Sequence, residues 1–164
     1  MASKMATLDD LYTDLLKDLY SAEKQLVKAL PKIAKNAQSP DLQKAFQEHL
    51  KQTEGHVERI ERIFSDMDGS PRGIKCVGME GLIEEGNELL QEDVEPDVLD
   101  AGLIAAAQKV EHYEISGYGT ARAWAQRLGY DSAARLLKQT LDEESLANEK
   151  LTKIAESHVN MEAQ

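Results

Sequence analysis

The sequence predicts an all-α protein, a single four-helix bundle that takes in all 164 residues (1–164). Its composition is dominated by Leu, Ala, Glu, Lys and Gln, which are the better helix formers. Only four prolines and ten glycines are present, and aromatic residues make up 5% of the chain. A hydrophobic content of 41% is enough for one domain with a sizeable core. Apolar residues also recur at helical spacing in four long segments, which supports the bundle.

The first two long helices are expected over residues 7–36 and 39–67. The acidic pair in "TLDD" suits the positive N-terminal end of the first helix. Ser39 is a good N-cap for the second helix, and Pro40 fits its first helical position. The turn-forming stretch "DGSPRG" predicts where the second helix ends.

A short helix is expected over 79–91, and two further long helices over 97–128 and 131–156. The segment "EDVEPD" separates the short helix from the next one, and Gly129 separates the last two. We expect the tail "SHVNMEAQ" to be frayed. The connection that holds the short helix is long enough to cross the bundle, as it does in ferritin-like four-helix bundles.

The charge balance disfavours several classes of function. Nineteen basic and thirty acidic residues give a formal net charge of −11, which repels nucleic acids and anionic membranes. No stretch approaches the roughly 18 apolar residues of a membrane helix, and the start "MASKMATLDD" lacks the apolar core of a signal peptide. Cys76 is the only cysteine, so no intrachain disulfide can form and a cytoplasmic location is expected.

Carboxylates lie on the apolar side of the two C-terminal helices. At about 100° per residue, Glu114 and Glu144 sit within roughly 20° of the centre of their apolar stripes, and Glu111 lies further off centre. A carboxylate on the inner face of a helix is costly unless something positive meets it. The simplest alternative is a pair of buried acids satisfied by Lys or Tyr neighbours.

The two long hairpins suggest what that positive partner is. A shift of 91 residues superimposes Glu23 on Glu114, and both residues lie 15 positions before a turn. Antiparallel hairpins bring positions equidistant from the turn to the same level. Glu23 is therefore expected to face the turn of helix that carries His56, and Glu114 to face Glu144. Four candidate ligands from four helices converge on one level of the core.

This arrangement is typical of di-metal carboxylate bundles, in which two helices each give a Glu and two others each give Glu-x-x-His. Histidine and carboxylate ligation suits iron, with manganese as the alternative. The expected metal ligands are Glu23, His56, Glu114 and Glu144, with Glu111 as a further ligand or a bridge to the site.

Four segments resemble the bacterial YciF-like stress proteins: "LIAAAQKVEHYEISGYGT", "KCVGMEGLIEE", "YSAEKQL" and "HLKQTEGHVERIE". The resemblance runs from about Leu8 to Ile154. It implies a ferritin-like bundle related to rubrerythrin, a cytoplasmic homodimer and a role in general stress. It also supports a di-iron site.

The chain departs from the full ligand pattern at two positions. Thr53 stands three residues before His56, where a Glu is expected, and Ala147 stands three residues after Glu144, where a His is expected. A single or asymmetric metal site therefore stays open beside a fully loaded pair. His49 lies two helical turns before His56 and is interpreted as a packed core histidine, with a role as a metal ligand or as a neighbour of the ligands as the alternative. The roles of three other flanking polar residues stay open: Gln52, Glu54 and Asn148.

The leading hypothesis is a non-haem di-iron or manganese oxidoreductase that carries out iron oxidation or peroxide detoxification. Its partners would be metal ions and peroxide or oxygen, with no nucleic acid and no membrane. The alternative is a metal-poor structural or protein-interaction dimer of the stress response. A passive metal buffer is a third reading, which binding without turnover would distinguish.

Overall fold

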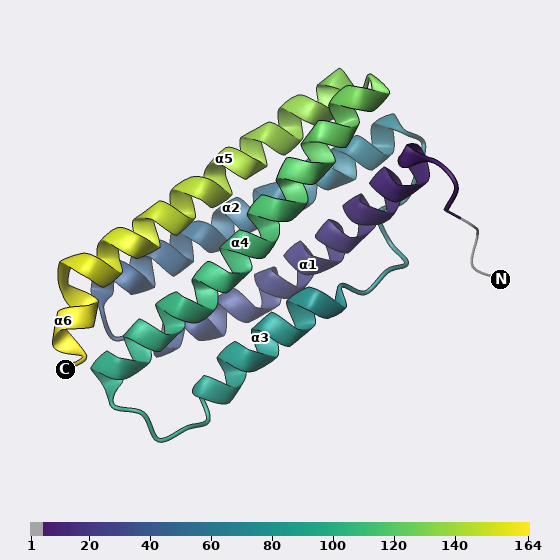
Figure 1. The fold of residues 1–164 in the computed structure, drawn as a ribbon. Coiled ribbons are helices and arrows are strands. Elements are labelled where there is room, and N and C mark those ends of the chain that lie inside the picture. The colour runs from purple at the N-terminus through teal and green to yellow at the C-terminus, as the bar shows by residue number, and fades with distance from the viewer. Residues whose placement is uncertain (1–4) are drawn as a thin grey trace.

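The computed structural model describes residues 5–164, so the first four residues of the expected domain lie outside it. The described residues form helices joined by short connections, without a strand among them (Figure 1). The five main helices are α1 (Leu8–Asn36), α2 (Pro40–Asp66), α3 (Val77–Leu89), α4 (Pro96–Leu128) and α5 (Asp131–Ile154). The all-α bundle predicted from the sequence is confirmed.

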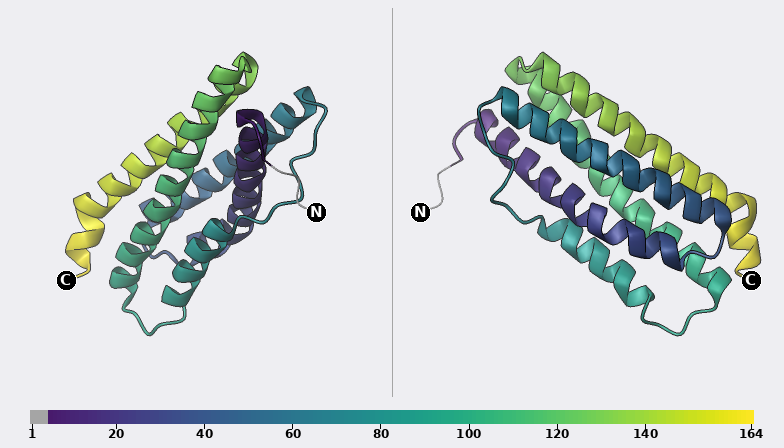
Figure 2. Two further views of the ribbon diagram at one scale, coloured as in Figure 1. Left: turned by 45° about the vertical axis from the view of Figure 1, so that its right-hand side comes forward. Right: turned by 180° about the vertical axis from the view of Figure 1, so that it is seen from behind.

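Four long helices make the bundle and α3 lies outside it. Helix α1 packs along α2, and α4 packs along α5. Helix α3 lies against α1 and α4 at one edge (Figure 2), within the crossover that connects the two hairpins. Among the described residues, no helix is both long and apolar enough to cross a membrane.

The N-terminal ends of the first two helices are closed by side chains. Thr7 Oγ1 accepts a hydrogen bond from the Asp10 amide at 3.1 Å, and the Asp10 carboxylate accepts one from the Thr7 amide at 2.9 Å. This reciprocal capping box satisfies two amides that the helix leaves free. In α2, Ser39 Oγ accepts from the Leu42 amide at 3.4 Å, and Pro40 is the first residue of the helix.

Asp100 is a buried carboxylate with a structural role. Its two oxygens accept hydrogen bonds from the amides of Gln38 (2.8 Å) and Ser39 (2.7 Å) in the α1–α2 connection. The side chain lies on α4 and is only 3% exposed. Because both amides would otherwise be unpaired, Asp100 fixes the first hairpin to the second.

The C-terminal segment corrects one expectation. The tail expected to fray instead continues as a π-helical turn, Ala155–Val159, and a short helix α6, Asn160–Glu162. Val159 is 1% exposed and belongs to the apolar core, and His158 Nε2 lies 3.3 Å from Ser39 Oγ. These contacts give the tail a packed face, which the sequence pattern alone did not reveal.

The hydrophobic core is divided into two clusters by a polar layer. One cluster includes Leu26, Phe46 and Leu151, and the other includes Leu19 and Tyr118. On α1 the division falls at a glutamate that lies between the leucines of the two clusters. The layer holds the candidate metal ligands.

Candidate metal centre

The polar layer contains every candidate ligand predicted from the sequence. It draws side chains from all four long helices: Glu23 from α1, His56 from α2, Glu111 and Glu114 from α4, and Glu144 from α5. All of these side chains are buried, and Glu111 is the most exposed of them at 2%. The convergence of four helices on one level thus appears in the structure as the hairpin register suggested.

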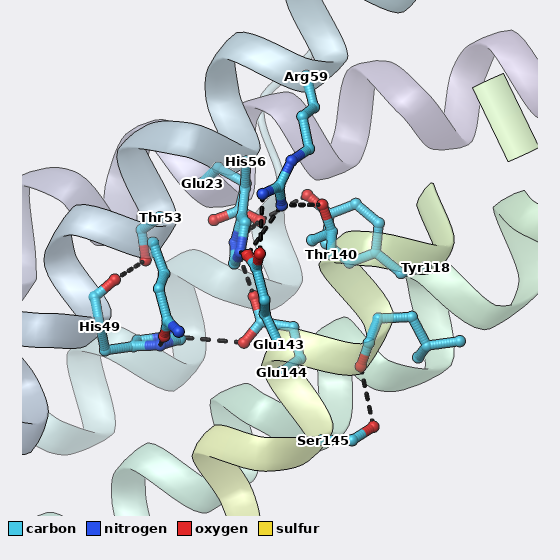
Figure 3. A network of polar contacts seen from close by, with 12 residues as sticks. Glu23, His49, Thr53, His56, Arg59, Tyr118, Thr140, Glu143, Glu144 and Ser145 are labelled. Carbon is cyan, nitrogen blue, oxygen red and sulfur yellow. Dashed lines mark hydrogen bonds and ion pairs between the residues drawn. The ribbon is translucent and has the colours of Figure 1, made fainter. Parts of the chain in front are cut away.

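One cluster is formed by Glu23, His56 and Glu144. His56 Nδ1 lies 3.2 Å from Glu23 Oε1 and 2.9 Å from Glu144 Oε1. Figure 3 shows the imidazole between these carboxylates. Tyr118 donates a hydrogen bond of 2.5 Å to the same oxygen of Glu23. One ligand atom from each of the three clustered residues falls within 4.8 Å of the others, a spacing that a single metal ion can span.

The other nitrogen of His56 is held from the outer side. His56 Nε2 lies 2.8 Å from Glu143 Oε2, and Arg59 donates to both oxygens of Glu143 at 2.8 Å. Burial alone raises the pKa of Glu143, but the hydrogen bonds from Arg59 and His56 outweigh it and lower that pKa. An ionised Glu143 keeps the proton on Nε2, which leaves Nδ1 to face the interior.

The protonation of His56 follows from these contacts. Burial by itself lowers the pKa of His56, but hydrogen bonds to Glu144 and Glu23 more than reverse this and raise it to about 10. In the metal-free protein His56 is therefore an imidazolium, and its Nδ1 proton lies between two carboxylates. A metal ion bound at that place would displace this proton.

A second cluster is formed by His49, Glu111, Glu114 and Glu144. His49 Nε2 lies 3.2 Å from Glu111 Oε1 and 3.6 Å from Glu144 Oε2. Glu144 therefore belongs to both clusters, with Oε1 toward His56 and Oε2 toward His49. A carboxylate placed in this way can bridge two cations.

Several buried polar atoms of the layer have no hydrogen-bond partner. They include both oxygens of Glu114, Oε2 of Glu111 and Oε2 of Glu23. Burial is the main cause that raises the pKa values of Glu111 and Glu114 well above normal. Repulsion from Glu144 adds to the shift at both, while His49 opposes it at Glu111. Unpartnered buried carboxyl oxygens are rare in folded proteins, so these call for a ligand or for protons.

The sequence interpretation missed one member of this site and gave another as its less favoured alternative. His49 was interpreted first as a packed core histidine and second as a ligand or a neighbour of the ligands, and it lies in the second cluster. Its spacing of seven residues from His56, two helical turns, is the signal that supported the second interpretation. Glu143 was not singled out, because its role depends on how closely α2 and α5 approach.

Two of the flanking polar residues, Thr53 and Gln52, contact His49. Thr53 is buried, but its hydroxyl donates to the backbone oxygen of His49 at 2.9 Å. Gln52 is exposed, with its Oε1 3.3 Å from His49 Nδ1, and Glu54 is exposed. Asn148 is half-buried, and its backbone oxygen accepts a hydrogen bond from Thr152.

A family model described as a domain of unknown function (DUF892) matches residues 7–164. The chain belongs to this family. Its relative in Escherichia coli (strain K12), protein YciF, is 49% identical over 161 residues, which cover 98% of this chain and 97% of YciF. The chain is thus a homologue of a bacterial stress protein, as the sequence resemblance predicted.

Solved structures of relatives agree with the fold. The crystal structure of the E. coli stress protein YciF aligns with a TM-score of 0.92 over 95% of this chain and 99% of that one, at 49% identity. YcfI from Rhodopseudomonas palustris aligns with a TM-score of 0.89 at 41% identity, over 93% of this chain and 97% of that one. A Xanthomonas campestris protein of 18% identity shares the fold, with a TM-score of 0.74 over 93% of this chain and 94% of that one.

Proposed function

We propose that this chain is a ferritin-like stress-response protein that binds two metal ions in the polar layer of its bundle. The first ion would be held by Glu23, His56 and Glu144, and the second by His49, Glu111, Glu114 and Glu144. Glu144 would bridge the two ions through its two oxygens. This assignment adds His49 to the ligands expected from the sequence.

Glu114 carries the proposal. Its side chain is fully buried, both carboxyl oxygens are unpartnered, and the groups that repel its charge are Glu144, Glu23 and Glu111. Each unsatisfied buried polar atom costs about 1–3 kcal/mol. A bound cation can offset this unfavourable free energy, because a metal that binds the native state adds its binding energy to folding.

The donor set favours iron or manganese. Two imidazoles and four carboxylates are hard to intermediate ligands, and no thiolate takes part, since Cys76 contacts Tyr113 and Asp18 instead. An iron or manganese pair bound here would supply redox chemistry toward peroxide or oxygen. We infer iron oxidation or peroxide detoxification as the activity, which suits a homologue of a stress protein.

The surrounding residues have defined parts in this proposal. Glu143, ionised and clamped by Arg59, orients His56 so that Nδ1 faces the metal. Tyr118 donates to Glu23 and directs the remaining oxygen of that carboxylate inward. The two apolar clusters above and below the layer exclude water from the ions.

The test is the metal content of protein purified without oxygen and loaded with Fe²⁺. Wild type is compared with Glu114→Ala/Glu144→Ala and with a control, Glu149→Ala/Glu156→Ala, which removes the same charge from exposed positions of the C-terminal helical segments. We expect about one to two ions per chain in wild type and control, and none retained in the site variant. Oxidation of the bound Fe²⁺ by oxygen or by peroxide then separates the two activities.

One observation favours the competing function, a metal-poor structural or protein-interaction dimer. His56 already pairs with three carboxylates as an imidazolium, which stabilises the first cluster without a metal. If wild type retains no iron or manganese after anaerobic loading, the oxidoreductase proposal is wrong and this one replaces it. The homodimer and the cytoplasmic location implied by the family resemblance stay predictions under either function.

A further inference from the structure

A largely apolar cavity of about 140 Å³ lies beside the second cluster. Its walls come from all four long helices, and they include Leu30 of α1, Phe46 of α2, Val110 of α4 and Leu151 of α5. The cavity is therefore a feature of the bundle interior.

The inner end of the cavity reaches the candidate metal ligands. His49 and Glu111 both line it, and Glu111 Oε2 is buried without a hydrogen-bond partner. Three alanines line the cavity as well: Ala45, Ala107 and Ala147. Ala147 is the position at which the ligand pattern expects a histidine. The missing ligand is therefore matched by open space, which a histidine side chain there would fill.

The outer end of the cavity opens between α2 and α5. Glu48 and Lys150 line it and form an ion pair across the two helices, and each side chain is close to half exposed. Leu146, which also lines the cavity, is 62% exposed. The opening thus consists of flexible, solvated side chains, which can move aside for a small molecule.

We propose that this cavity binds small uncharged organic molecules that carry one hydroxyl or hydroperoxyl group. The apolar body would lie against the leucine, phenylalanine and valine walls, and the polar end would meet His49 and Glu111. The proposal rests on the proposed function only in assigning the cavity as the substrate pocket of that metal centre. Binding itself needs no metal.

Size and charge define the class of ligand. An apolar cavity of about 150 Å³ inside a protein is known to stay dry and bind benzene, so this one suits about six to eight non-hydrogen atoms. The inner end is lined by a carboxyl group with two more carboxyls in the same cluster. An anionic ligand of the same size would lose its hydration on entering these apolar walls, with carboxyl groups and, in the described part of the chain, no Lys or Arg at the inner end to compensate.

The test uses benzyl alcohol and benzoate, two probes of similar size that differ in charge. Binding to chelator-treated, metal-free protein is followed by chemical-shift changes in amide NMR spectra. The variants are Ala107→Leu, which fills the cavity, and Ala105→Leu, which adds the same side chain at an exposed position two residues away on α4. Ala147→Leu fills the cavity from α5 and is the second variant should Ala107→Leu fail to fold.

We expect benzyl alcohol to shift the amides around the cavity in wild type and Ala105→Leu. Its dissociation constant should rise about tenfold or more in either cavity-filling variant. Benzoate should bind at least about tenfold more weakly than the alcohol to wild type. Absence of benzyl alcohol binding to wild type, equal binding to all variants, or a preference for benzoate would overturn the inference. Because no metal is present, these results are independent of the iron-loading test.

Discussion

Replacing Glu114 by methionine should stabilise the metal-free protein while it weakens the metal-loaded one. Methionine is unbranched and close to glutamate in length, so it can occupy the same fully buried position. The substitution removes two unpartnered oxygens and one member of a group of crowded carboxyls. A residue retained for structure alone would give the opposite result in the metal-free state.

The magnitude follows from the burial of the carboxyl. Removing two unsatisfied oxygens, at about 1–3 kcal/mol each, raises the free energy of unfolding. Imperfect packing of the methionine side chain lowers it again by up to about 1.5 kcal/mol. We expect a net stabilisation of about 2 kcal/mol without metal, which for a chain of this length raises Tm by about 4–8 °C. With free metal at 100 times its Kd, wild type gains about 2.7 kcal/mol per site, and the variant gains less because one ligand is missing.

The assay is thermal and urea unfolding of both proteins, first with a chelator and then with anaerobic Fe²⁺. Asp100→Leu is the matched control, because Asp100 is another buried acid of the same helix, and its two oxygens are paired. Its removal leaves two backbone amides unpaired and should destabilise the protein by about 1–3 kcal/mol for each, with or without metal. A Glu114→Met variant that is less stable than wild type in the chelator, or equally stabilised by Fe²⁺, would refute the reasoning.

The pH dependence of the stability of the metal-free protein is a second test of Glu114→Met. Glu111 and Glu114 have pKa values raised above the unfolded value of 4.5, so the folded protein binds more protons and loses stability as the pH rises above 4.5. His56 acts in the same direction, because its contribution is complete below pH 6.5 and is lost as the pH rises through about 10. Glu114→Met should make the decline above pH 4.5 shallower in the metal-free state.

Three further substitutions test the hydrogen bonding and the helix packing around the site. Glu143→Ala removes the group that holds His56 Nε2 and should weaken metal binding by about 10–100-fold. Glu149→Ala, at an exposed position of the same helix, should leave the metal affinity unchanged. Equal metal affinities of the two variants in a titration would contradict the orienting role of Glu143. Gly119→Ala should stabilise the chain by about 1 kcal/mol, since a Cβ there meets nothing within 4 Å. The free energy of unfolding of Gly117→Ala should be about 1–3 kcal/mol lower than that of Gly119→Ala, because the new Cβ would lie 2.7 Å from a buried leucine of α1. Equal stabilities of the two glycine variants in urea unfolding would show that α1 and α4 leave room for a Cβ at position 117.

The bundle itself could be predicted because its signals are local. Apolar spacing and capping residues such as Ser39 act within a few positions of the chain. The helices of the structure therefore begin and end close to the positions that these signals predicted. The short helix was expected at 79–91 and lies at Val77–Leu89, because Cys76 Sγ caps it by accepting a hydrogen bond from Met79 N. Cysteine is not among the preferred N-caps, so the start was placed too late.

The same distinction applies to the candidate site, where residues with a signal in their own helix could be predicted more easily than residues that depend on contacts between helices. Glu114 and Glu144 could be found from the sequence, because an acid at the centre of an apolar stripe stands out against its own helix. His49 and Glu143 could not be assigned with the same ease, because their roles depend on contacts between different helices. Glu143 lies about 100° around α5 from its neighbour Glu144, and it reaches His56 only because α2 and α5 pack closely enough for Arg59 to clamp it.

The polar layer that divides the hydrophobic core also bears on how long the protein lasts in a cell. A proteolytic enzyme cuts the open forms of a chain, and the population of those forms is set by the stability of the closed one. If cations join the two halves of the core, iron scarcity would leave each half to hold only by its own apolar contacts. The abundance of the protein would then follow the supply of metal after synthesis, without any change in the expression of its gene.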